Sequence, residues 1–156
     1  MMTRPAIPSD ADLLAPQLRP QDVIEIQAMH GRHVDLAEAV RTAIRCSSSA
    51  WTAFLGDEIA MVGGVADVGS LLTGNIGSPW LLGSRVMFAR PGVLTRVGRR
   101  YVAFMHTTYP DLVNFIDARN DRSIAWLQRL GFTVHTGRPL EMGPDRMTFY
   151  RFTKSA

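Results

Sequence analysis

The sequence predicts a single α/β domain over residues 1–156, in which helices flank a mixed, largely antiparallel twisted sheet. The length of 156 residues suits one domain, and 46% hydrophobic residues against 20% charged ones supply a sizeable core. Segments with apolar residues at helical spacing alternate along the chain with short apolar segments typical of strands. No repeat, low-complexity tract or long linker divides the chain, so one layered sheet is expected.

The first half of the chain predicts a strand, three helices and a hairpin. Residues 3–7 are expected to form an edge strand, and Ser9 to cap a short helix that Pro16 limits. Apolar residues recur at helical spacing in DVIEIQAMHG, where they are Val23, Ile26 and Met29, and in HVDLAEAVRTAIRCS. Two further helices are therefore expected around Gly31. In WTAFLGDEIAMVGGVADVG two apolar runs flank the turn GDE, which predicts a hairpin over residues 51–68.

Strands and helices alternate more regularly in the second half. A strand is expected at Trp80–Leu82, and a helix from Pro91, which is a favourable first helical residue. Strands are also expected at residues 112–118 and 132–136. The segment RMTFYRFTK, residues 146–154, alternates in the manner of a final strand.

The stretch FIDARNDRSIAWLQRLGFTVH, residues 115–135, has sharp boundary signals. Asn120 is expected to cap a helix. Gly131 is expected in the left-handed conformation past the helix end, with Phe132 folding back on Leu127 as the hydrophobic contact of a Schellman motif. Local chemistry alone thus predicts a strand, helix, turn and strand here.

The segment ARNDRSIAWLQRLGF resembles the closing motif of the GNAT acyltransferase fold, in which an Asn opens a helix that ends in Gly-Phe eleven and twelve residues later. The order of elements over nearly the whole chain is similar too. The resemblance implies acetyl-CoA bound in a splay between the fourth and fifth strands, here Trp80–Leu82 and Leu112–Ala118. It also implies that the residues binding this cofactor are Leu81, Leu82, Arg90 and Asn120.

The loop that would bind the pyrophosphate departs from the family pattern. A cradle of backbone N–H groups needs closely spaced glycines, and Gly83, Gly92 and Gly98 are too far apart to form one. Residues 84–89 are instead expected to form an inserted helical turn capped by Ser84. Charge is the alternative way to bind a diphosphate, through Arg85, Arg90 and Arg96. The other interpretation is that these three side chains are solvated.

Catalytic residues are not identified. Leu127 stands where many family members have a tyrosine that acts as the acid, and LLTGNIGSPWLLG contains no carboxylate or histidine to act as a base. Trp126 is expected to be a core or rim aromatic residue. Asp67 is the one acidic candidate nearby for a base.

The run from SPWLLGSRVMFARPG through LQRLGFTVH also resembles the internal virion protein A group of T7-like podophages, small phage proteins with a GNAT-like fold. Together with the missing motifs, this favours a non-catalytic protein of the host cytoplasm or the virion. Its role would be structural or in assembly, with other virion or assembly proteins as partners and no cofactor. The alternative is an acetyl-CoA-dependent N-acetyltransferase with an atypical cofactor loop.

The charged residues allow a third class of function. Lys154 is the only lysine among 17 basic residues, and arginine favours bidentate contacts with phosphate or carboxylate. Genome composition is the other explanation for the excess of arginine. A nucleic-acid-binding accessory would use Arg96, Arg99 and Arg100, although the interleaved aromatic residues of single-strand grooves are missing. No metal site is expected, because His30 and His33 have no third ligand nearby in sequence. No run of 18 apolar residues occurs, so no membrane segment is expected.

Overall fold

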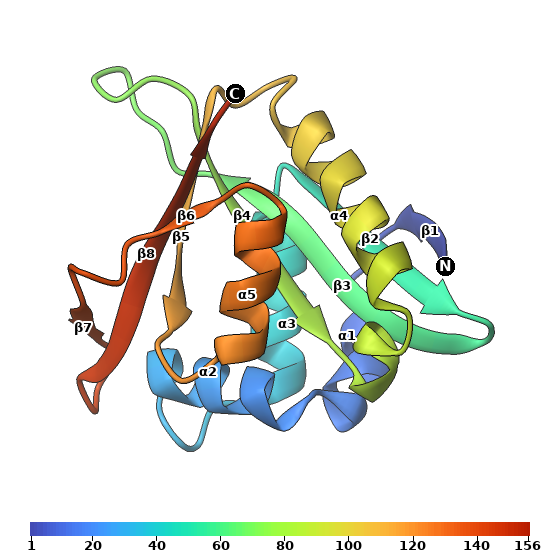
Figure 1. Cartoon of the computed structure of the whole chain (residues 1–156). Coiled ribbons are helices and arrows are strands. Elements are labelled where there is room, and N and C mark those ends of the chain that lie inside the picture. The colour runs from blue at the N-terminus through green and yellow to red at the C-terminus, as the bar shows by residue number, and fades with distance from the viewer.

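A computed structural model describes residues 1–156, in which one open sheet has helices on both faces (Figure 1). The strands are β1 (Met2–Pro5), β2 (Ser49–Leu55), β3 (Glu58–Asp67), β4 (Ile76–Gly83), β5 (Asp111–Asp117), β6 (Thr133–Val134), β7 (Leu140–Met142) and β8 (Met147–Ser155). The helices are α1 (Asp10–Leu14), α2 (Pro20–His30), α3 (Leu36–Cys46), α4 (Pro91–Met105) and α5 (Asp121–Arg129). Two short 3₁₀ turns, η1 (Ala15–Gln17) and η2 (Arg85–Phe88), follow α1 and β4.

The sheet is mixed and largely antiparallel, as predicted. Its strand order is β1-β2-β3-β4-β5-β8-β6, with β7 also paired to β8. Only β4 and β5 are parallel, and they pair just at Ile76 with Asp111 and Gly77 with Leu112. Beyond this short contact the two strands diverge toward their C-terminal ends and form a V-shaped opening in the sheet (Figure 1).

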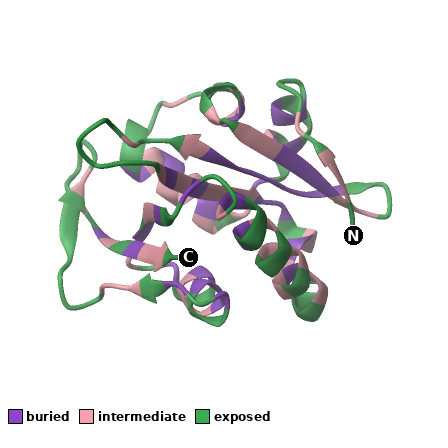
Figure 2. Cartoon of the chain, turned by 90° about the horizontal axis from the view of Figure 1, so that it is seen from above, coloured by how far each residue is buried: buried purple, intermediate pink, exposed green.

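Two hydrophobic clusters hold the layers together, one on each face of the sheet. Helices α4 and α5 cover one face, where Leu94, Val102 and Leu127 pack on strand residues such as Leu112. Helices α1, α2 and α3 cover the other face, where buried side chains include Leu14 and Val40. Figure 2 shows buried residues concentrated in the central strands and the inner helix faces, whereas outer helix faces and connecting loops are exposed.

The predicted N-terminal strand and helix both form, but β1 covers Met2–Pro5 and not residues 3–7, and the expected cap does not form. Ser9 stands at the N-cap of α1 without a side-chain hydrogen bond. Asp10 provides the connection instead, because its buried carboxylate pairs with Arg4 at 2.6 Å and accepts hydrogen bonds from the Thr52 hydroxyl and the Ile7 N–H. Burial opposes ionisation, but these hydrogen bonds outweigh it and hold the pKa of Asp10 below its usual value.

The helices on either side of Gly31 and the hairpin formed by β2 and β3 are also confirmed. Strand β6 is shorter than the expected strand at residues 132–136, and β7 was not predicted. Both are short strands paired to β8, so only the partner strand defines them. No helix combines the length and apolar character needed to span a membrane.

The boundaries of α5 agree with the sequence in detail. The Asn120 side chain accepts a hydrogen bond from the Ser123 N–H, and Gly131 has φ 89°. The Gly131 N–H donates to the Gln128 carbonyl, and the Phe132 N–H donates to the Leu127 carbonyl at 3.1 Å. This pair of bonds defines the Schellman motif.

Candidate functional site

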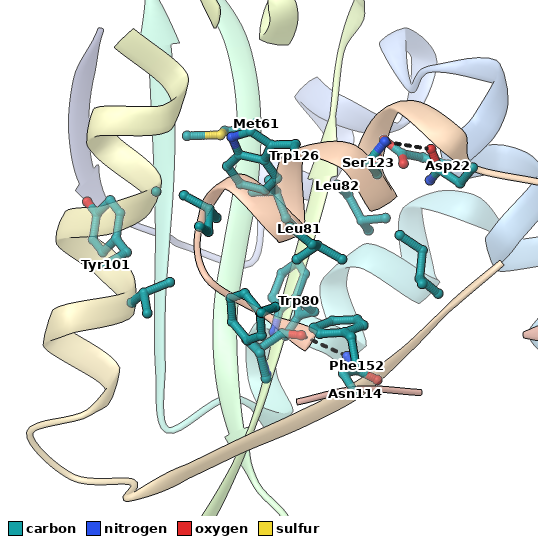
Figure 3. A pocket seen from close by; sticks show the side chains of 18 of the residues that line it. Asp22, Met61, Trp80, Leu81, Leu82, Tyr101, Asn114, Ser123, Trp126 and Phe152 are labelled. Atoms are coloured by element: carbon teal, nitrogen blue, oxygen red, sulfur yellow. Dashed lines mark hydrogen bonds between the residues drawn. The ribbon is translucent and has the colours of Figure 1, made fainter. Parts of the chain in front are cut away.

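A mostly apolar cavity of about 200 Å³ lies in the V between β4 and β5 and continues beneath α4 and α5 (Figure 3). Three of the four residues expected to bind a cofactor line it: Leu81 and Leu82 on β4, and Asn120 at the start of α5. The fourth, Arg90, is exposed at the N-cap of α4 and does not line the cavity.

The β4 edge of this cavity is free of strand partners. After Gly77, β4 no longer pairs with β5. The Asn114 side chain on β5 donates a hydrogen bond of 2.8 Å to the Pro79 carbonyl across the opening (Figure 3). A ligand lying along β4 would therefore meet backbone polar groups that no strand satisfies.

Helix α2 crosses the open end of the V (Figure 1). The Asp22 carboxylate accepts a hydrogen bond of 2.8 Å from the N–H of Gly83, the last residue of β4. The Gly83 carbonyl accepts from the Arg19 N–H at 2.9 Å. One helical turn further on, the Glu25 carboxylate accepts a hydrogen bond of 2.6 Å from the N–H of Asp117, the last residue of β5. Two acidic side chains of α2 thus hold the ends of the two diverging strands.

Sequence reasoning missed these acids and misassigned part of the apolar stripe. Met29 is exposed, whereas Asp22 and Ala28 are buried beside the correctly predicted Ile26. An acid three residues before another on one helical face was the available signal. It was not informative by itself, because solvated acids have the same spacing.

Glu25 is the carboxyl group on this cavity with a perturbed pKa. Burial raises the pKa of Glu25 to about 7, and the nearby charges of Asp22 and Asp117 add to the rise. Hydrogen bonds from the Asp117 N–H and the Asn120 side chain oppose it. Asp22 and Asp117 pair with Arg19 and Arg119, each at 2.6 Å, but Glu25 has no ion-pair partner. A carboxyl group that titrates near neutral pH is suited to general acid–base chemistry.

The loop after β4 contains the predicted helical turn, η2, but the predicted cap is wrong. The Ser84 hydroxyl donates to the Ile59 carbonyl of β3 at 2.7 Å, so it is not available to η2. Met87 is buried against the end of β4, and Phe88 lies under the guanidinium groups of Arg19 and Arg122. The loop between β4 and α4 is thus filled by the packed side chains of η2.

A basic groove lies at the N-terminus of α4. It is lined by Pro91, Gly92, Thr95, Arg96, Arg99 and Arg129. None of the three arginines pairs with a carboxylate; Arg99 donates only to the Arg129 carbonyl, at 3.5 Å. The first N–H groups of α4 lack helical partners and add partial positive charge. The groove therefore suits an anion.

The cavity and the basic groove lie on either side of the contact between α4 and α5. A Cβ atom at Gly98 would lie 2.8 Å from the Trp126 ring and 3.1 Å from Leu130, so glycine permits this close packing. Gly98 and Leu130 line the cavity. Their sequence neighbours Arg99 and Arg129 line the groove.

The arginines brought together differ from those expected for a charge-based site. Arg96 lines the groove, but Arg85 and Arg90 do not; Arg99 and Arg129 take their place. Arg129 carries no sequence signal of its own, because its position beside α4 depends on helix packing.

Neither Leu127 nor its neighbour Trp126 can take the role of the missing tyrosine. Leu127 is buried, and Trp126 is a buried core residue whose indole N–H has no partner. Tyr101 lines the cavity, but its ring stacks on Trp51 at 3.9 Å and its hydroxyl points away from Leu81 (Figure 3). Asp67, the acidic candidate named from sequence, is exposed and does not line the cavity. His, Cys, Asp and Glu side chains form no cluster of three that could hold a metal ion.

Comparison with known proteins supports the fold. No protein-family model and no curated protein matches the chain. Among solved structures, it is similar to a GNAT-family acetyltransferase from Streptococcus pneumoniae (17% identity, 99% of both chains covered, TM-score 0.67). It is also similar to a ribosomal-protein-alanine N-acetyltransferase from Brucella melitensis (15% identity, 100% of both chains, TM-score 0.73). A putative acetyltransferase from Salmonella typhimurium, solved with acetyl-CoA, matches with 16% identity and TM-score 0.68 over 99% of this chain and 93% of that one.

The chain has the GNAT fold. At 10–17% identity the likeness extends to the fold and not to activity. The three structures named are acetyltransferases, so the resemblance to phage internal virion proteins gains no support from them.

Proposed function

We propose that the protein is an acyl-CoA-dependent acyltransferase that modifies an amine. The observation that carries this proposal is the pairing of an apolar cavity in the V with an arginine-rich groove at the N-terminus of α4. A thioester of coenzyme A has the same two parts, an uncharged arm and a phosphate-bearing end.

The residues present fit such a ligand by charge, without a glycine cradle. Arg96, Arg99 and Arg129 would hold the phosphates, since they have no acidic partners. Leu81 and Leu82 would flank the uncharged arm. Arg90 would add positive charge at the entrance. Asn120 would position the start of α5 beside the ligand, because its side-chain oxygen already caps that helix. The bound thioester would supply an activated acyl group.

Glu25 is the proposed base. At pH near 7 it is partly ionised and can take a proton from an acceptor ammonium group, which leaves a nucleophilic amine. The C–N bond then forms as the thioester C–S bond breaks, and the second proton of the amine ends on the thiolate. A thiol with a pKa of about 8.5 leaves as a thiolate without a strong acid. The lack of a hydroxyl at Leu127 is therefore compatible with transfer.

Calorimetric titration with coenzyme A and acetyl-CoA tests the proposal. Both should bind, and a ligand at about 100 times its Kd should stabilise the fold by about 2.7 kcal/mol. Arg96→Ala combined with Arg129→Ala should weaken binding at least about 100-fold, because two charge-assisted contacts are lost. Arg100→Ala is the matched control, since Arg100 is on the same helix but outside the groove. Absence of binding to the wild-type protein would overturn the proposal.

A non-catalytic role is the second candidate. Two observations favour it: both backbone groups of Gly83 are already bonded to α2, and Leu127 replaces the usual acid. Its expected partners are virion or assembly proteins, and in the nucleic-acid version a single strand on Arg96, Arg99 and Arg100. Under this candidate coenzyme A does not bind, and loss of the gene leaves protein acetylation unchanged. In the nucleic-acid version Arg100→Ala weakens oligonucleotide binding as much as Arg96→Ala.

A further inference from the structure

Strands β5 and β8 leave part of one sheet face open to solvent. Leu112 and Ile116 of β5 belong to the hydrophobic cluster under α4 and α5. Because side chains alternate along a strand, Phe115 points to the opposite face, the one on which α2 lies. The register places Arg151 of β8 directly opposite Phe115, so the two side chains share this face. Phe115 is 36% exposed and Arg151 is exposed, so both are accessible to a ligand.

This exposed pair lies beside the proposed base. Phe115 and Glu25 both line the cavity in the V. The Glu25 carboxylate accepts its hydrogen bond from the N–H of Asp117, two residues after Phe115 on β5. With about 3.4 Å per residue and about 4.8 Å between strands, the Cα of Arg151 lies roughly 8 Å from that of Asp117. A small molecule can therefore contact Glu25 and Arg151 together.

Arg151 has no acidic partner in the protein. The acids of the adjoining strands bond elsewhere, each at 2.6 Å: Asp117 to Arg119, Glu141 to Arg146 and Asp111 to Ser155. His135 and Thr153, the polar neighbours of Arg151, bond to each other at 2.8 Å. A guanidinium group with no carboxylate partner suits a carboxylate from a ligand, which it can contact through two parallel N–H groups.

We propose that the acceptor is a small amine that also carries a carboxylate and an apolar group, as a short peptide does. Arg151 binds the carboxylate, Phe115 contacts the apolar group, and the amine lies at Glu25. This inference rests on the proposed function and specifies its acceptor. Transfer itself is unchanged: Glu25 takes one proton of the ammonium group, the C–N bond forms as the C–S bond breaks, sulfur keeps the bonding electrons, and the second proton ends on the thiolate.

Calorimetry on the complex with coenzyme A, which has no acyl group to transfer, measures acceptor binding without turnover. Glycyl-phenylalanine and its C-terminal amide are matched probes, because they have the same amine and ring and differ in the carboxylate. The acid should bind about tenfold more tightly than the amide, as expected for a hydrogen bond between charged groups. Equal binding of the two probes, or binding of neither, overturns the acceptor inference alone. Failure of coenzyme A itself to bind overturns the proposed function as well.

A variant of Arg151 then locates the carboxylate. Arg151→Gln should weaken binding of the acid to the level of the amide and leave binding of the amide unchanged. With acetyl-CoA as donor, it should raise KM for the acid about tenfold at unchanged kcat, because the contact is made equally before and during transfer. Arg100→Gln is the matched control, since Arg100 is also exposed but belongs to α4 on the other face of the sheet. A preference for the acid that persists in Arg151→Gln overturns the proposal.

Discussion

Helices α4 and α5 begin in opposite chemical surroundings, although both N-termini lie near the open end of the V. Helix α5 starts with buried Asn120 as its cap and Asp121 in its first turn. Helix α4 starts with Arg90 at the N-cap position, without a side-chain cap and without an acid in its first turn. Both helices have partial positive charge at their N-termini. They differ in the side chains that interact with this charge.

At the start of α5, side chains of the protein itself bond the first N–H groups and balance their charge. At the start of α4 no side chain does so, which leaves room for an anion. Capping oxygens and first-turn acids normally complete a helix N-terminus. At α4 their place is taken by Pro91, which has no N–H to satisfy, and by arginines of the basic groove. Under the proposed function, the start of α5 serves stability and the start of α4 serves binding, and the following substitutions test this division.

The largest stability effect is expected at Glu25, which bonds the strand end just before α5. Its folded pKa of about 7 exceeds the ordinary value of 4.5, so folding favours the protonated form. Its contribution is complete below pH 4.5 and is lost as the pH rises to about 7, by about 2–3 kcal/mol. Glu25→Gln should remove this decline.

Chemical denaturation at pH 5 and pH 8 measures the effect. Glu58→Gln, at the exposed first residue of β3, is the control and should leave the decline intact. Asp10 and Asp117 have lowered pKa values, so their contributions disappear only in more acidic solution. A decline that persists in Glu25→Gln would assign it to another group.

Loss of the α5 cap should have the next largest effect. Asn120→Ala leaves the Ser123 N–H without its acceptor inside the protein, so unfolding should become easier by about 1–2 kcal/mol. Arg90→Ala, the equivalent change at α4, should leave the melting temperature unchanged because no cap bond is lost. Equal losses in thermal unfolding would contradict the division between the two helices.

At the other end of α5, Gly131→Ala should destabilise by about 1 kcal/mol, because Gly131 has φ 89°. Gly137→Ala is the control, since its φ is not positive and no atom lies within 4 Å of a Cβ there. Urea unfolding would measure both. A Gly131→Ala protein as stable as the Gly137→Ala protein would mean that the turn tolerates a side chain.

The smallest effect is expected when an acidic residue, such as α5 has in its first turn, is placed at the start of α4. Arg90→Asp places an acid at the N-cap, which should stabilise the helix by about 0.5–1 kcal/mol. The same charge should weaken coenzyme A binding about tenfold, because it competes for the helix N-terminus. Stability and affinity should therefore change in opposite directions, which thermal unfolding and calorimetry can follow on one protein. A gain in both would contradict the proposed role of the groove.

The α5 unit could be predicted because its determinants lie within a dozen residues of sequence. Asn120, Gly131 and Phe132 specify both ends of the helix by local hydrogen bonds. The sheet class followed from the same kind of local pattern. The turn η2 was also predictable, but the partner of Ser84 was not, because the Ile59 carbonyl belongs to a distant strand.

The candidate site could not be predicted in the same way, because its parts meet only through packing. Arg99 and Arg129 are 30 residues apart and are brought together by the contact of α4 with α5 at Gly98. Glu25 meets the Asp117 N–H across 92 residues. Residue types indicated charge and acidity, but only the tertiary structure brings these groups together.

All three tryptophans of the chain, Trp51, Trp80 and Trp126, line the cavity. Intrinsic fluorescence excited at the indole band therefore comes entirely from the walls of this one site. Trp51 lies parallel to Tyr101 at 3.9 Å, and a fixed aromatic pair of this kind contributes to near-UV circular dichroism only while native packing persists. The unlabelled protein thus contains its own optical probe of whatever enters the cavity.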